Sequence, residues 1–145
     1  MQTEIKIGER LTELMFDKEI NNKELAKILG VSPHTVGKWK HGANNMRLTQ
    51  FIAIADYFNC SLDFLVGRSE TVIDFTPQEC PPFYEHLRSI LKSKRKTKYR
   101  INKETKIKSS HFVDWKNGSD PQIHSLIELA DYLDVSLDYL VGRDR

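Results

Sequence analysis

The sequence has few cysteines and no long apolar run. Two cysteines in 145 residues cannot build a disulfide framework, which excludes a small disulfide-stabilised secreted domain. We expect Cys60 to be a small buried hydrophobe and Cys80 an ordinary free thiol. The first ten residues lack the apolar segment of a signal peptide, and no apolar run approaches the roughly 20 residues of a membrane span. We therefore expect a soluble cytoplasmic protein without membrane contact.

The sequence also lacks the patterns that catalysis requires. It contains no Gly-rich phosphate loop, no nucleophile elbow and no paired catalytic carboxylates. His34 and His41 have no cysteine or carboxylate at a ligand spacing, and a zinc site needs four convergent ligands. Asp63 and Asp138 recur in equivalent places, where we expect capping and solvation at a helix surface to explain them. We expect no enzyme, no metal and no cofactor.

Charge is present but unevenly spread along the chain. The formal net charge is +2, with residues 1–69 at +1, residues 70–82 at −3 and residues 83–145 at +4. The total says little about partners. Residues 88–108, however, hold ten Lys or Arg and one acid, which is a surface able to neutralise phosphates.

What the sequence does have is an internal repeat. Residues 51–68 match residues 126–143 at 11 of 18 positions, at an offset of 75 residues. At an offset of 76, "WKHG" from Trp39 meets "WKNG" from Trp115. The shift by one residue falls in a surface loop, where length changes are tolerated. We interpret the chain as two copies of one module, residues 1–69 and 83–145, joined by a proline-rich linker at 70–82, whose Val72, Ile73 and Phe75 can pack on a module.

Each module is expected to contain five helices and no strand, because no segment alternates with period two. In the first copy, apolar spacing predicts a helix near residues 4–17. Asn21 and Glu24 form a capping box for a second helix that stops at Gly30. Ser32 caps a third helix with Pro33 in its first position, ending at Gly42. A fourth helix places Leu48, Phe51, Ala55 and Phe58 on one face, and Ser61 caps a short fifth helix that Gly67 ends. Trp39 and Trp115 are expected in the two cores.

The short connection "LGVS" between the second and third helices predicts a helix-turn-helix. "ELAKILGVSPHTVGKWKHG" followed by "LTQFIAIADYFNCSLDFLVG" resembles the lambda-repressor/Cro-like (XRE-type) helix-turn-helix family of bacterial and phage regulators. The resemblance implies an all-α fold of two tandem helix-turn-helix domains. The second copy departs in the turn, with Lys106 at the place of Gly30 and Lys108 at the place of Ser32.

The resemblance also implies which residues meet double-stranded DNA. In the family, the start of the third helix reads base edges, while the second helix's start and the loop after the third contact phosphates. Val36 and Trp39 must face the core, which independently leaves His34, Gly37 and Lys38 outside. The predicted base contacts are Pro33, His34, Thr35, Gly37, Lys38, Ser109, Ser110, His111 and Asp114, with apolar Val113 beside them. The predicted phosphate contacts are Asn22, Lys23, Lys40, His41, Asn44, Asn45, Arg47, Lys96, Lys98, Tyr99 and Arg100.

These residues together predict a sequence-specific transcriptional regulator, a repressor, that reads DNA with the first module. Asp114 aligns with Lys38 and would face phosphates of like sign, so we expect the second module to add backbone affinity rather than specificity. The alternative is that the second module dimerises or binds another protein. Whether two chains form a homodimer, or one chain supplies both recognition helices, is left open. RNA is a weaker alternative, because no aromatic stacking platform is evident.

Overall fold

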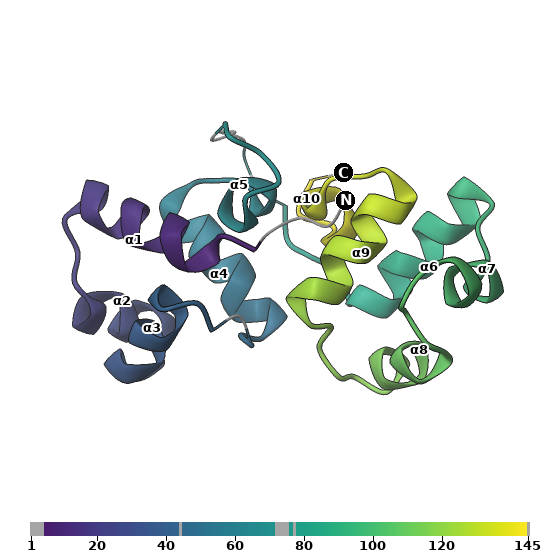
Figure 1. Ribbon diagram of the computed structural model, residues 1–145, viewed down its shortest axis with the longest axis horizontal. Helices are drawn as coiled ribbons and strands as arrows, with labels where there is room; N and C mark the ends of the chain where they lie inside the picture. Colours follow the sequence, from purple (N-terminus) through teal and green to yellow (C-terminus); the bar gives the residue numbers. More distant parts are fainter. Residues whose placement is uncertain (1–4, 44, 72–75, 77, 145) are drawn as a thin grey trace. The chain divides into compact units, whose positions relative to one another are not determined.

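The computed structural model describes residues 5–43, 45–71, 76 and 78–144. Within these residues the chain forms ten helices and no strand, which confirms the all-α expectation. The chain divides into two compact units, Met1–Phe75 and Thr76–Arg145 (Figure 1). The expected linker contains this division; Val72, Ile73 and Phe75, which we expected to pack on a module, lie outside the described residues. None of the described helices has both the length and the apolar character needed to cross a bilayer.

The first unit contains α1 (Ile7–Lys18), α2 (Asn22–Leu29), α3 (Pro33–Lys40), α4 (Leu48–Phe58) and α5 (Leu62–Val66). The prediction placed the first helix too early. Lys6 is not helical, and its backbone N–H donates to the carbonyl of Val66 at 2.9 Å. This bond to the end of α5 holds residue 6 outside the helix. Glu4, the predicted start, lies outside the described residues.

The predicted helix ends around α2 and α3 are confirmed. Asn21 Oδ1 accepts the backbone N–H of Glu24 at 2.8 Å, and Glu24 Oε1 accepts that of Asn21 at 3.1 Å. Gly30 has a φ of 71°, and Ser32 Oγ accepts the backbone N–H of Thr35 at 3.2 Å. Each such cap stabilises its helix by about 1 kcal/mol. Local side-chain chemistry therefore sets where α2 ends and α3 begins.

The core of the first unit lies between its helices and includes both expected residues. Trp39 and Cys60 are buried, as predicted. Gly8 brings α1 against the end of α3, since a Cβ at Gly8 would lie 2.6 Å from the carbonyl oxygen of Lys40. No side chain larger than hydrogen fits there without moving the backbone. The other large, fully buried apolar side chains of this unit are Ile7, Leu11, Leu25, Phe51, Ile54, Leu62 and Leu65.

Arg10 is a buried cation that joins α1 to the end of α5. Its Nη1 donates to the carbonyls of Phe64 at 2.9 Å and Ser69 at 3.0 Å, and its Nη2 lies 3.2 Å from Glu70 Oε2. The guanidinium also lies over the Phe64 ring, 4.3 Å from its centroid. Because its donors have partners and its charge has a carboxylate, Arg10 can be buried without an uncompensated charge.

The second unit contains α6 (Phe83–Lys94), α7 (Lys98–Glu104), α8 (Ser109–Lys116), α9 (Ile123–Leu133) and α10 (Leu137–Val141). These helices begin at the residues that the two offsets predict from the first unit. α7, however, ends one residue before the equivalent of Leu29. Thr105 follows it with an extended backbone, φ −132° and ψ 179°, where the first unit has the left-handed Gly30 one residue later. Trp115 is buried, as expected.

Asp138 corrects the expectation that the repeated aspartates are solvated. Its side chain is buried, and Oδ1 lies 2.8 Å from Nη1 of the buried Arg143. The equivalent pair in the first unit, Asp63 and Arg68, is 2.6 Å apart and partly exposed. The repeated "SLD…VGR" pattern thus records an ion pair at the end of each unit's last helix, a pairing that sequence spacing alone did not reveal.

Four helices end in a left-handed residue that is not glycine. α1 ends at Glu19, α4 at Asn59, α6 at Arg95 and α9 at Asp134, with φ between 54° and 58°. Asparagine and aspartate tolerate this conformation better than other residues with a side chain. Glu19 and Arg95 therefore carry backbone strain.

Candidate nucleic-acid interface

The turn between α2 and α3 places the outer face of α3 at the surface of the first unit. α3 packs closely against both α2 and α1 (Figure 1). Val36 and Trp39 point into the core, each no more than 2% exposed. Pro33, His34 and Lys38 are exposed as a result. Three predicted base-contacting residues therefore lie on the accessible side of one helix.

Thr35 and Gly37 are less available than the other predicted base contacts. Both are half-buried. The Thr35 hydroxyl shares a hydrogen bond with the Ser32 hydroxyl at 2.9 Å, within the cap of α3. An ideal Cβ on Gly37 would lie 3.6 Å from Asn22 Nδ2. The Thr35 hydroxyl is thus part of the cap, and a Cβ at Gly37 would make only an ordinary contact with α2.

Lys40 and Asn22 form a polar link between the start of α2 and the end of α3. Lys40 Nζ donates to Asn22 Oδ1 at 3.0 Å. Both residues are half-buried, whereas a free phosphate-binding lysine is usually extended into solvent. The bond presents the remaining donors of both groups together, the arrangement suited to one phosphate oxygen.

The other predicted phosphate contacts of the first unit are exposed. Lys23, His41, Asn45 and Arg47 are accessible, and Asn44 lies outside the described residues. The backbone N–H of Arg47 donates to Gln50 Oε1 at 2.9 Å, which fixes residue 47 at the start of α4 while its guanidinium lies outside. The sequence from residue 31 to residue 47 contains no acid, so no carboxylate of this segment opposes an approaching phosphate.

In the second unit, two predicted base contacts already have hydrogen-bond partners. Ser109 Oγ accepts from Asn102 Nδ2 at 2.8 Å. His111 Nδ1 accepts the backbone N–H of Lys108, the N-cap residue of α8, at 2.8 Å, as Glu24 Oε1 accepts that of Asn21 at the start of α2. Its ring also lies against Trp115, with centroids 5.9 Å apart. Ser110, Val113 and Asp114 are exposed.

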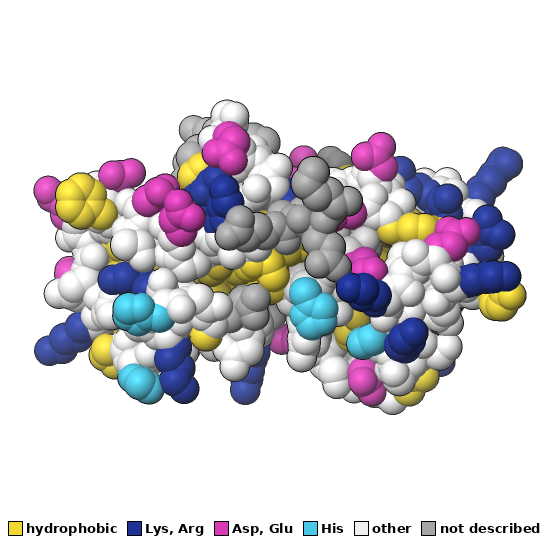
Figure 2. Space-filling view, viewed as in Figure 1, with side chains coloured by type: hydrophobic (Ala, Val, Ile, Leu, Met, Phe, Trp, Pro, Cys, Tyr) yellow, Lys and Arg dark blue, Asp and Glu magenta, His cyan; other side chains and the backbone are white. Residues whose placement is uncertain are grey.

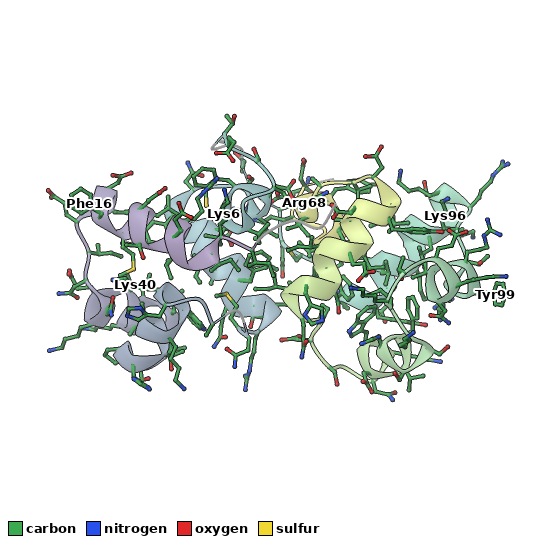
Figure 3. The ribbon with its side chains drawn as sticks, in the orientation of Figure 1. Lys6, Phe16, Lys40, Arg68, Lys96 and Tyr99 are labelled. Atoms are coloured by element: carbon green, nitrogen blue, oxygen red, sulfur yellow. The ribbon has the colours of Figure 1, made fainter. Side chains whose placement is uncertain are left out.

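The basic segment of the second unit is fully accessible. Residues 92–100 are all exposed, and Lys and Arg side chains gather over α6 and α7 (Figure 2). Tyr99 is 67% exposed and, with Lys96, lies at the outer side of these helices (Figure 3). Arg100 forms an ion pair with Glu104 at 3.0 Å, which offsets one of the positive charges. The predicted phosphate contacts of this unit thus form one positive surface.

Lys98 differs from the other predicted phosphate contacts because it lies among aromatic rings. Its Nζ donates to the Tyr84 hydroxyl and lies 4.9 Å from the Tyr84 centroid and 5.7 Å from that of Phe112. The hydrogen bond from Lys98 lowers the pKa of the Tyr84 phenol, and the charges of Lys98, Lys116 and Arg88 add to this effect. Four residues around Lys98 were not predicted from the sequence as site residues: Tyr84, Asn102, Phe112 and Lys116.

A second titratable pair joins α7 to α9. The Tyr132 hydroxyl donates to Glu104 Oε2. This hydrogen bond lowers the pKa of Glu104, and the same bond raises the pKa of Tyr132. Neither group is part of a metal site: in the described ranges, no three His, Cys, Asp or Glu side chains come together as possible ligands.

Residues 10–68 match the family model of the Cro/C1-type helix-turn-helix DNA-binding domain. The match covers α2 to α5 and most of α1, and it includes each predicted DNA contact of the first unit. It supports a DNA-binding regulator of the XRE-like helix-turn-helix kind, a class that typically has no enzymatic activity. A search among curated proteins and a search among solved structures give no match.

Proposed function

We propose that the protein is a transcriptional repressor that binds a specific sequence of double-stranded DNA with α3 of the first unit in the major groove. The observation that supports this most directly is the accessible face of α3, with His34 and Lys38 outside and Val36 and Trp39 inside. Lysine can donate to guanine O6 and N7, and histidine can donate to base acceptors. Asn22, Lys23, Lys40, His41, Asn45 and Arg47 would hold the phosphate backbone on either side.

The second unit would add affinity without much sequence preference. Its exposed cations at residues 92–100 can neutralise phosphates, whereas Ser109 Oγ and His111 Nδ1 already accept hydrogen bonds within the unit. Asp114 is exposed where the first unit has Lys38, and a carboxylate there is repelled by phosphates. We therefore infer that the first unit reads the operator and the second strengthens its binding.

A role in protein association is the second candidate for the second unit. Val113 is 55% exposed on α8, and an exposed apolar side chain at that place suits a protein contact better than a DNA contact. Under this alternative, two chains would meet through their second units. Two recognition helices would then reach successive major grooves, about 34–36 Å apart.

The test is selection of bound sites from random duplex DNA by the full chain and by Lys38→Ala. We expect the wild-type chain to select one motif and Lys38→Ala to lose preference at one base pair, at a cost of about 1–3 kcal/mol. Lys27→Ala on exposed α2 is the matched control and should leave the motif unchanged. An unchanged motif with Lys38→Ala would show that α3 is not in the groove.

The salt dependence of binding tests the phosphate contacts separately. Affinity should fall steeply between low and physiological salt, because each neutralised phosphate releases condensed counterions. Lys40→Ala and Arg47→Ala should weaken all sequences alike and make this dependence shallower. Affinity that stays constant with salt would contradict DNA binding through these cations.

A further inference from the structure

The second unit has a cavity of about 270 Å³ between α6, α7 and α8. Tyr84 lines it from α6, Lys98 and Asn102 from α7, and Ser109, Phe112, Val113 and Lys116 from α8. We call it the α6–α8 pocket. It is large enough for one aromatic ring with an attached charged group, since a cavity of about 150 Å³ already holds benzene.

The pocket exists because three small residues of the first unit are replaced by large ones. At the offset of 76 residues, Gly8 corresponds to Tyr84, Ala26 to Asn102 and Gly37 to Val113. In the first unit, Gly8 allows α1 to touch the backbone at Lys40, and Ala26 is buried where α2 packs on α3. In the second unit, α7 and α8 do not pack in this way. These three larger side chains of the second unit all line the pocket.

The walls of the pocket combine positive charge with apolar surface. Lys98 and Lys116 both line it, and in the described part of the chain neither Nζ forms an ion pair. The ring of Phe112 is mostly buried against Trp115, 5.4 Å between centroids, and Val113 covers another side. Two ammonium groups beside an aromatic floor attract an anion that also carries an apolar part.

Asn102 adds a polar group whose hydrogen bonding is incomplete. Its Nδ2 donates to Ser109 Oγ, but its Oδ1 is buried and has no partner among the described residues. An unpaired buried acceptor costs about 1–3 kcal/mol. The first unit has alanine here, so a wall without this cost is compatible with the fold.

We propose that the α6–α8 pocket binds a small organic anion, a carboxylate or phosphate attached to one aromatic or apolar group. Its anionic group would lie between Lys98 and Lys116, and its apolar part would rest on Phe112 and Val113. Lys98 is also a proposed phosphate contact, so a bound anion would compete with the DNA backbone for it. This last consequence rests on the proposed DNA-binding function; binding of the anion itself does not.

The experiment is a titration of the full, ¹⁵N-labelled chain without DNA, followed by NMR. The probes are phenyl phosphate and benzoate. Inorganic phosphate and acetate represent their anionic halves, and phenol represents the aromatic half. We expect saturable shifts of the Asn102 side-chain amide and of the Ser109 and Val113 backbone amides. One of the two joined probes should bind at least about tenfold more tightly than either half, and which one it is identifies the anionic group.

Matched variants in the two units decide whether the pocket is responsible. Lys116→Gln should weaken binding about tenfold, whereas Lys40→Gln at the equivalent place in the first unit should leave it unchanged. Lys98→Gln removes the other ammonium group of the pocket, so it gives the same test if Lys116→Gln does not fold. Equal binding of phenyl phosphate, benzoate and inorganic phosphate, or shifts that persist in both pocket variants, would overturn the site.

The same titration repeated in the presence of DNA separates the pocket proposal from the proposed DNA-binding function. Both proposals hold if the anion binds the free chain and weakens DNA binding by the wild type but not by Lys98→Gln. If the anion binds and no DNA does, the pocket stands and the proposed function fails. If DNA binds and no probe shifts the pocket amides, the pocket proposal alone is wrong.

Discussion

At the scale of single residues, hydrogen bonds within the protein decide which polar groups remain available for a partner. The hydroxyl of Thr35 and the Nδ1 of His111 serve as parts of helix caps, while His34 and Lys38 have exposed side chains. Asn22 and Lys40 are only partly available, because one N–H of the Lys40 ammonium group is bonded to Asn22 Oδ1. Two residues in equivalent predicted roles can therefore differ in their ability to bind DNA.

Loss of the Asn22–Lys40 bond should weaken DNA binding without altering the motif. We expect Asn22→Ala and Lys40→Ala each to reduce affinity for all sequences, because the bonded pair orients both donors toward the backbone. A double-mutant cycle measured by fluorescence anisotropy should give a coupling of about 0.5–1.5 kcal/mol. Strict additivity of the two losses would mean that the hydrogen bond has no part in DNA binding.

Tyr132→Phe should raise the pKa of Glu104 toward its ordinary value, because it removes the hydrogen bond that lowers it. The lowered pKa means that this bond stabilises the fold above the carboxyl's unfolded pKa and ceases to do so as pH falls through the folded one. Acid unfolding of the wild type should therefore show a contribution that Tyr132→Phe lacks. A ¹³C NMR titration of the Glu104 carboxyl checks this, with Glu128 as the internal reference.

At the scale of elements, the helices could be predicted wherever a local side chain ends them. Asn21, Gly30, Ser32 and Ser61 act through bonds within three or four residues, and the structure has these caps where the sequence placed them. The connection from α7 to α8 could not be predicted this way. It depends on Thr105, whose Oγ1 accepts the backbone N–H of Ile107 at 3.0 Å, and on the bulk of Tyr84 from another helix.

The candidate site, too, could be predicted only where it depends on spacing within one helix. The exposed face of α3 follows from the spacing of Val36 and Trp39, which any helix in that segment would bury. The α6–α8 pocket follows from contacts among three helices, and no spacing within one segment indicates it. Comparing the two copies for small residues replaced by large ones would have marked Tyr84, Asn102 and Val113, although not the space between them.

Alanine at two glycines of the helix-turn-helix should change stability in opposite directions. Gly30 has a left-handed φ of 71°, so Gly30→Ala should destabilise the first unit by about 1 kcal/mol. Gly37 is inside α3, where a Cβ meets only ordinary contact, so Gly37→Ala should stabilise it by about 0.5–1 kcal/mol. Urea unfolding followed by circular dichroism measures both. The same sign for both changes would contradict the helix ends described here.

At the scale of the whole molecule, each unit has its own core, with Trp39 buried in the first and Trp115 in the second. Each also has its own Asp–Arg pair at the end of its last helix, buried only in the second unit. A buried pair that loses one partner leaves an uncompensated charge, whereas solvent compensates an exposed one. The units should therefore respond differently to the same substitution.

Asp138→Asn should destabilise the second unit by about 3–5 kcal/mol, because it leaves the charge of Arg143 buried without its carboxylate. Asp63→Asn, the matched change at the partly exposed pair, should cost clearly less. Unfolding in urea, followed by NMR signals of the Trp39 and Trp115 indoles, should show the Trp115 transition moving alone for Asp138→Asn. Equal movement of both signals would mean that the two units unfold as one.

The left-handed ends at Glu19 and Arg95 show where the protein is less stable than its fold permits. A residue with a side chain is destabilised in this conformation by roughly 1–2 kcal/mol. Glycine removes that cost, but its greater freedom in the unfolded chain destabilises the folded state by roughly 0.5–1 kcal/mol. Glu19→Gly and Arg95→Gly should each raise the melting temperature by a few degrees, in calorimetry of one unit's transition at a time. Glu19 lies outside α3, so Glu19→Gly would give a more stable starting protein. Destabilising substitutions in α3 could then be studied in a protein that still folds and can be purified.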